Sequence, residues 1–201
     1  MSTANLDPTL DGQVVHAAEH EEEDNRLFGF IVFLLSESVI FLSFFAGYIV
    51  FKTNAADWYP AGFEGLESRE PFINTVVLVS SSFVIYFAER FLHKENLWGF
   101  RAFWLLTMAM GSFFLYGQAV EWLGLPFGFT DGVFGGTFYL LTGFLGLHVL
   151  TGVLLQGIML GRAFIPNNYA GGEYGIQATS LVWHFVDVIW IVLFILIYVW
   201  K

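Results

Sequence analysis

Two ionisable side chains stand one helical turn apart in an apolar run near the end of the chain, where His184 and Asp187 interrupt Ala178 to Trp200. Glu37 and His148 interrupt two other apolar runs. A carboxyl group and an imidazole can share a proton or pass it on, and an imidazole can also ligate haem iron. Ionisable groups near a bilayer centre cost roughly 2.5–3.5 kcal/mol each, so they persist mainly where they face protein and have a role.

The composition places the chain in a membrane. Hydrophobic residues make up 56% and charged residues 13% of the 201 positions, and the mean hydropathy is +0.64. Soluble domains carry about 25% charged residues. The sequence holds no cysteine, which excludes disulfides and thiolate chemistry. It also lacks a phosphate-binding loop, a nucleophile elbow and a basic nucleic-acid-binding face, so no nucleic-acid partner is expected.

Five apolar segments are each long enough to cross a hydrocarbon core of about 30 Å at about 1.5 Å per residue. The links between them are short, and the two longest hold the proline, glycine, asparagine and charged residues typical of loops. The sequence therefore predicts an all-α polytopic membrane protein, a bundle of five transmembrane helices. The predicted spans are 27–51, 72–92, 100–122, 133–161 and 178–200.

The segment before the first span differs from the rest of the chain. Residues 1–26 hold seven acids against the single Arg26, which predicts a disordered acidic N-terminal tail ahead of a transmembrane domain at 27–201. The distribution of Lys and Arg favours a cytoplasmic N-terminus and a C-terminus on the outer side. In that orientation the inner side carries Arg26, Arg90, Lys94, Arg101 and Arg162, and the outer side carries Lys52, Arg69 and Lys201.

The four intramembrane ionisable residues fall at similar depths. Glu37, His148 and Asp187 lie within two residues of the centres of their predicted spans, which is about 3 Å. His184 lies five residues from its centre, about 7.5 Å, and all four are displaced toward the same side of the membrane. We therefore expect a buried polar cluster that joins the first, fourth and fifth spans. Which acid meets which histidine cannot be read from depth.

This cluster has several interpretations. It can fix the register and rotation of the helices, it can transfer protons, or its histidines can be the axial ligands of a haem. No ladder of further ionisable residues extends from it to both surfaces in the sequence. Gln118 and Glu121, one turn apart near the end of the third span, predict a further polar contact that is either buried or interfacial. Gly157 and Gly161 have the spacing typical of closely packed membrane helices.

Four stretches of the sequence carry a resemblance to a known family: Ser36 and Glu37, Gln118 to Trp122, Thr137 to Val149, and Trp183 to Trp190. They resemble subunit III of the haem-copper oxidases, in the five-helix bacterial form of the cytochrome c type. The resemblance covers nearly the whole chain after residue 26, in order and at the right separations. Leu145 stands where many members of that family have histidine, whereas His148 fits the pattern.

The resemblance implies an accessory subunit of a respiratory terminal oxidase that reduces dioxygen to water and pumps protons. In that family this subunit has no haem or copper, packs against catalytic subunit I, binds phospholipid between its helices and supports proton uptake. Glu37 matches the intramembrane glutamate of the family. The implied partners are oxidase subunits I and II, which carry the haem and copper, and membrane phospholipids. The chain alone is expected to be catalytically inert.

The resemblance also bears on the electron donor and the membrane. Cytochrome c oxidases, quinol oxidases and an accessory protein of nitric oxide reductases share this subunit type. Glu37 and the stretch from Thr130 to Gly135 look more like the cytochrome c branch. The donor is expected to bind elsewhere in the complex. The expected location is a bacterial energy-coupling membrane, either the plasma membrane or an internal respiratory membrane.

Two alternatives belong to other classes of protein: an independent small proton channel or transporter, and a membrane cytochrome that uses His148 and His184. Five spans cannot divide into equal halves, and all five prolines fall outside or at the edges of the spans, which disfavours a transporter with repeats and broken helices. Two histidines and two acids are also few for a site that needs about three or four convergent ligands, so no metal is expected in this chain.

Overall fold

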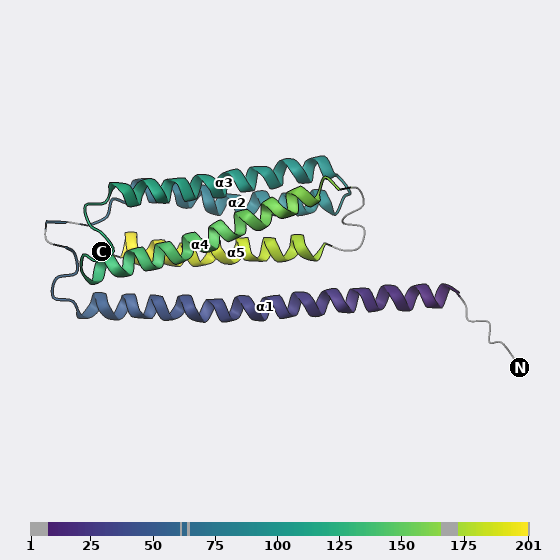
Figure 1. Ribbon diagram of the computed structural model, residues 1–201, viewed down its shortest axis with the longest axis horizontal. Coiled ribbons are helices and arrows are strands. Elements are labelled where there is room, and N and C mark those ends of the chain that lie inside the picture. The colour runs from purple at the N-terminus through teal and green to yellow at the C-terminus, as the bar shows by residue number, and fades with distance from the viewer. Residues whose placement is uncertain (1–7, 61, 64, 166–172, 201) are drawn as a thin grey trace, which may run out of the picture.

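The computed structural model of the protein describes residues 8–60, 62–63, 65–165 and 173–200, with side chains from Asn25 onward. In this part the chain is helical and contains no strand. Consecutive helices run antiparallel, so the helices alternate in direction through the bundle (Figure 1). The helices are α1 (Pro8–Asn54), α2 (Arg69–Leu92), α3 (Leu97–Gly124), α4 (Gly132–Arg162) and α5 (Tyr174–Phe194), and α5 continues into the π-helical turn η1 (Ile195–Val199).

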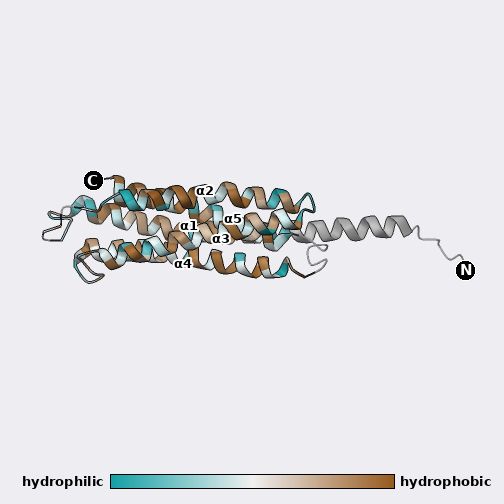
Figure 2. Ribbon diagram, turned by 90° about the horizontal axis from the view of Figure 1, so that it is seen from above, coloured by the Kyte–Doolittle hydropathy of each residue, from teal (hydrophilic) through white to brown (hydrophobic). Residues whose placement is uncertain are grey.

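Each of the five helices contains a segment long and apolar enough to cross a membrane, which confirms the predicted fold class. Apolar residues dominate the middle of the bundle, and polar residues gather toward its two ends (Figure 2). The segments begin and end within a few residues of the predicted spans. They are Asn25–Asn54, Arg69–Leu92, Leu97–Gly124, Gly132–Arg162 and Tyr174–Val199.

The segment before the first span differs from the expected disordered tail. In the structure α1 begins at Pro8 and continues without a break to Asn54, so the helix extends beyond the other four (Figure 1). Residues 1–7 lie outside the described part of the chain. The helical extension has a physical reason, because the segment is rich in Ala and Glu, and lengthening an existing helix avoids the cost of nucleation.

The fifth helix is the centre of the bundle, and α1 lies at its edge. α5 packs against α1, α2 and α4, whereas α1 packs mainly against α5 and α4. Half of the membrane segment of α5 is buried inside the protein, against 6% for α1. Polar side chains on α5 can therefore meet partners from helices on either side, and groups on α1 meet mainly α4 and α5.

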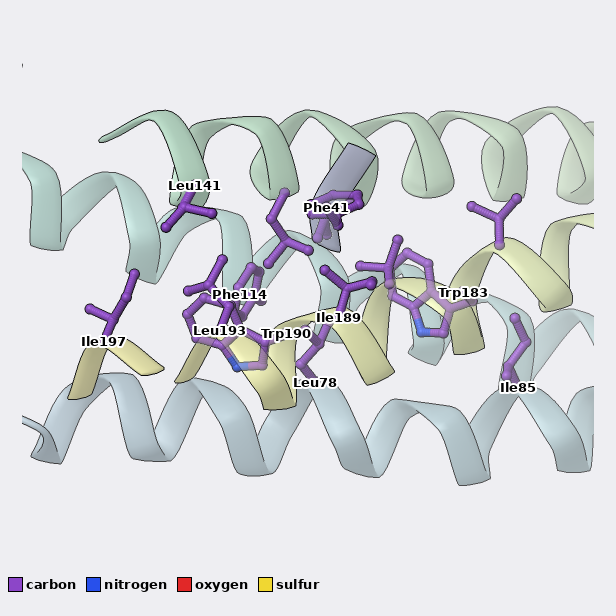
Figure 3. Packing of buried hydrophobic residues seen from close by; sticks show 14 of the residues in the cluster. Phe41, Leu78, Ile85, Phe114, Leu141, Trp183, Ile189, Trp190, Leu193 and Ile197 are labelled. Atoms are coloured by element: carbon purple, nitrogen blue, oxygen red, sulfur yellow. The ribbon is translucent and has the colours of Figure 1, made fainter. Parts of the chain in front are cut away.

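Buried tryptophans pack the interior and tie the helices together (Figure 3). Trp183 of α5 fills the space left by Gly111 of α3 and Gly152 of α4, where a Cβ atom on Gly152 would lie 2.9 Å from the indole ring. Its Nε1 donates to Ser81 Oγ of α2 at 2.8 Å. A membrane interior offers no water to an unpaired indole, so this hydrogen bond fixes the contact of α5 with α2.

Candidate functional site

Glu37 of α1 and His148 of α4 form one of two polar pairs deep in the membrane segments. Oε2 of Glu37 lies 3.4 Å from Nε2 of His148, and each side chain is about one-fifth exposed, at 19% and 20%. Nδ1 of His148 lies 2.8 Å from the carbonyl oxygen of Phe144, one turn earlier in α4. A carbonyl oxygen only accepts hydrogen bonds, so Nδ1 carries a proton in this arrangement.

The protonation of Nδ1 has a consequence for the other side of the ring. An ionised carboxylate cannot donate, and a neutral imidazole protonated on Nδ1 has only a lone pair at Nε2. A favourable contact between His148 and Glu37 therefore needs one further proton, held by either group. The pair is either an imidazolium beside a carboxylate or an imidazole beside a carboxylic acid. In both forms one proton is shared between α1 and α4.

Aromatic rings surround this pair. The ring centroid of His148 lies 5.1 Å from that of Phe41 and 4.8 Å from that of Phe144. The pair also forms part of the wall of a groove of about 380 Å³ between α1, α4 and α5, whose other walls are almost entirely apolar. A polar group in such a groove combines an anchoring point with a surface that fits hydrocarbon.

The second polar pair is formed by His184 and Asp187 of α5 through a residue of α2. Ser82 Oγ lies 2.9 Å from Nδ1 of His184 and donates a hydrogen bond to Oδ2 of Asp187. Because a hydroxyl has one proton, donation to Asp187 leaves Ser82 to accept a hydrogen bond from the protonated Nδ1 of His184. The serine is thus the link between the two ionisable groups. Asp187 is only 4% exposed.

The structure places the four predicted residues in two pairs rather than in one cluster. Among the described residues, no hydrogen bond or ion pair joins Glu37 and His148 to His184 and Asp187. The physical reason is the position of α5, which presents different faces to α1 and α2. Sequence reasoning missed Ser82. The available signal was its depth, since Ser82 lies near the middle of α2, within a run of three serines.

Polar residues continue from the second pair toward the end of the bundle where α2 ends and α5 begins. His93 Nδ1 lies 2.9 Å from Glu173 Oε2 and joins the two helix ends. Glu89 stands one turn before His93 in α2 and is half-buried. Ser180 stands one turn before His184 and is buried.

The spacing of these residues places them along one interface. Ser82 and Glu89 lie seven residues apart on one face of α2, and His93, four residues further along, is the C-cap of that helix. Asp187, His184 and Ser180 follow one another at three and four residues on α5. The α2–α5 interface therefore carries polar groups from one end of the bundle to its middle. We call this set of polar residues on α2 and α5, from His93 and Glu173 to Ser82 and Asp187, the half-ladder. The sequence did not reveal it because its members alternate between two helices.

Gln118, Glu121 and Tyr198 form a separate polar group near the opposite end of the bundle. Gln118 Nε2 donates to Glu121 Oε2 at 3.0 Å, and Tyr198 Oη donates to Glu121 Oε1 at 2.8 Å. Gln118 is 5% exposed and Tyr198 is 3% exposed, so the contact lies inside the protein. Tyr198 lies in η1, and the group therefore ties the end of α3 to the end of the described chain.

Comparison with known proteins agrees with this architecture. Residues 9–201 match the family model described as cytochrome c oxidase subunit III. The chain belongs to the cytochrome c oxidase subunit III family. It is 42% identical over 181 residues to a cytochrome c oxidase subunit 3 from Thermostichus vulcanus, with 90% of each chain covered. It is also 42% identical to the Synechocystis protein of the same name, over 89% of this chain and 77% of the relative.

More distant members of the subunit III family match over a similar part of the chain. The subunit 3 of Lumbricus terrestris is 35% identical over 178 residues, which cover 86% of this chain and 69% of the relative. The family assignment and the five membrane-spanning helices make the chain an integral membrane subunit of an oxidase complex. The sequence-based prediction of subunit III is thus confirmed, and the quinol oxidase and nitric oxide reductase alternatives are not favoured.

The geometry also bears on the alternative of a bis-histidine cytochrome. Each imidazole is held within the protein, His148 by Glu37 and Phe144 and His184 by Ser82. The described residues contain no group of three or more His, Cys, Asp or Glu side chains that could hold a metal ion. The family assignment and the pairing of both histidines with groups of this chain therefore do not favour the cytochrome alternative.

Proposed function

We propose that this chain is a non-catalytic subunit of a cytochrome c oxidase, the respiratory enzyme that reduces dioxygen to water and pumps protons. The haem and copper would lie in oxidase subunits I and II, and the chain would stabilise the catalytic subunit. Cytochrome c would bind elsewhere in the complex. The observation that carries this proposal is that both intramembrane histidines are already engaged by side chains of this chain, within a fold shared with the subunit III family.

The groove between α1, α4 and α5 supports a role in lipid binding. Its walls are apolar apart from Glu37, His148 and Thr151, and its lining residues belong to the predicted membrane segments of α1, α4 and α5. A phospholipid acyl chain fits such a wall, because it leaves no polar group of its own unpaired there. We assign the groove to a structural phospholipid that fills the space between α1 and the rest of the bundle.

The half-ladder on the α2–α5 interface supports a role in proton uptake. It begins at His93 and Glu173. These two residues lie at the end of the bundle that also carries Arg26, Arg90, Lys94, Arg101 and Arg162. The excess of Lys and Arg at that end favours the cytoplasmic side of a bacterial energy-coupling membrane, with the C-terminus outside. Ionisable groups at this surface would collect protons on the side from which an oxidase takes them up.

The oxidase assignment is tested by purification of the complex through an affinity tag on this chain. We expect haem and copper spectra in the purified complex, oxidation of reduced cytochrome c, and little oxidation of quinol. A colourless protein that is purified alone and conducts protons after reconstitution would contradict the proposal. A complex that carries haem but oxidises only quinol would place the chain in a different branch of these enzymes.

The orientation is tested with single cysteines, because the natural sequence has none. Trp98 and Thr130 lie at opposite ends of the bundle and are both exposed. In intact cells a membrane-impermeant maleimide should label Thr130→Cys and should label Trp98→Cys only after lysis. The reverse pattern would overturn the proposed orientation.

A further inference from the structure

A small hollow lies on the outward face of α2, close to the end of its membrane segment. It has a volume of about 200 Å³ and is lined by Phe87, Arg90, Phe91 and Lys94. Phe103 of α3 closes one side, because its ring centroid lies 5.1 Å from that of Phe91 and 6.3 Å from that of Phe87. The hollow therefore combines an aromatic floor with two cationic side chains at its rim.

The two cations are available to a ligand. Arg90 and Lys94 are both exposed, and no salt bridge joins either of them to a carboxylate within the described ranges. Arg90 reaches only the ring and hydroxyl group of Tyr86, with 3.4 Å between its Nη1 and Tyr86 Oη. The neighbouring His93 is directed away from the hollow, toward Glu173 at the start of α5. The rim is thus positively charged.

The hollow also lies at the right level for a lipid headgroup. The membrane segment of α2 ends at Leu92, so Phe87 lies within the apolar layer and Lys94 lies beyond it. Arg90 and Lys94 are four residues apart, and side chains at this spacing lie on one face of a helix. Long cationic side chains near helix ends extend toward the headgroup layer, where basic pockets bind anionic lipid headgroups.

We infer that this hollow binds one anionic phospholipid, with its phosphate between the Arg90 guanidinium and the Lys94 ammonium and an acyl chain against Phe87 and Phe91. The aromatic floor favours a lipid over free phosphate, because a free phosphate ion gains nothing from the apolar surface. The site is separate from the groove between α1, α4 and α5, which lies on other helices. It does not depend on the proton-uptake proposal.

The test uses the intact oxidase complex that contains this chain, in nanodiscs of phosphatidylcholine mixed with phosphatidylglycerol. Native mass spectrometry counts the phosphatidylglycerol retained as the surrounding lipid is diluted. Arg90→Gln and Lys94→Gln should each weaken retention about 5-fold, and the double variant should weaken it about 30-fold. Higher salt should weaken retention in the natural complex and have little effect on the double variant.

Arg69→Gln is the matched control, because Arg69 is an exposed cation at the opposite end of the same helix. It should leave phosphatidylglycerol retention unchanged, and all variants should keep the haem spectrum of the complex. Equal retention by the double variant and the natural complex would overturn the inference. So would equal losses in Arg69→Gln and the double variant, or complete displacement of the lipid by soluble glycerol phosphate.

Discussion

Glu37 of α1 and His148 of α4 meet with 3.4 Å between Oε2 and Nε2, while Nδ1 of the same imidazole contacts a backbone carbonyl of α4. Only 6% of the membrane segment of α1 is buried, so this contact is one of few polar links between α1 and the rest of the protein. It is well suited to fix the rotational orientation of this peripheral helix about its own axis. Loss of the contact should therefore affect the position of α1 before anything else.

We predict that Glu37→Gln weakens the attachment of α1 and shortens the time over which the oxidase sustains turnover, without removal of a redox centre. A double-mutant cycle with His148→Phe should give a coupling energy on the order of 1 kcal/mol, because the pair is partly exposed and its contact is long. Ser36→Ala is the control, since the hydroxyl of Ser36 contacts only the carbonyl oxygen of Phe33 in its own helix.

The measurements are the decay of oxygen consumption with time and the haem spectrum of the purified complex. Additive effects of Glu37→Gln and His148→Phe would contradict the pairing. Loss of haem absorbance from a fully assembled complex would contradict the view that the pair acts on helix position.

We predict that Ser82→Ala destabilises the protein by about 1–3 kcal/mol, because it leaves the buried carboxyl group of Asp187 without its hydrogen-bond donor. Ser82→Thr keeps the hydroxyl group and should restore most of the stability. Ser112→Ala should have little effect, because the hydroxyl of Ser112 donates to Met108 in its own helix. The midpoint of thermal inactivation of the complex measures all three variants, and equal midpoints for Ser82→Ala and Ser112→Ala would refute the linking role of Ser82.

The glycines of α3 and α4 differ in what surrounds them, and this difference is testable. Gly111 and Gly152 lie against the indole ring of Trp183, whereas a Cβ atom on Gly146 would meet open space. Gly111→Ala and Gly152→Ala should each cost about 1–3 kcal/mol through overpacking. Gly146→Ala should be neutral or slightly stabilising, because alanine favours a helix. Thermal inactivation of the complex again gives the comparison, and a loss in Gly146→Ala as large as in Gly111→Ala would speak against a specific Trp183 contact.

Much of this fold could be predicted from the sequence, because hydropathy over about 20 residues reports directly on membrane spans. Span arithmetic also predicts depth, and it puts Glu37, His148, His184 and Asp187 near one level. Depth does not specify which faces of the helices meet. The sequence therefore could not separate one cluster of four residues from the two pairs that the structure contains.

The roles of serine and glycine residues in the membrane helices were the hardest to predict from the sequence. A serine in a membrane helix commonly donates to its own backbone, as Ser43 does to Val39, so nothing in the sequence distinguished Ser82. Spacing drew attention to Gly157 and Gly161, yet a Cβ atom on Gly161 would point into open space rather than against a neighbouring helix. The glycines that matter for packing are defined by the position of Trp183, which only the three-dimensional arrangement reveals.

The last prediction concerns the buried contact between Tyr198 and Glu121. Tyr198→Phe keeps the aromatic ring, which stacks on Phe194 with 5.4 Å between centroids, and removes only the hydroxyl group that donates to Glu121. The loss should be about 1 kcal/mol, the typical net contribution of one hydrogen bond, and up to about 3 kcal/mol if Glu121 is left unpaired. Gln118 still donates to the other carboxyl oxygen, which favours the lower value. Tyr116→Phe is the matched control because Tyr116 is 69% exposed. Tyr198→Phe should lower the midpoint of thermal inactivation of the complex and Tyr116→Phe should not. Equal midpoints for the two variants would contradict a stabilising contact between η1 and α3.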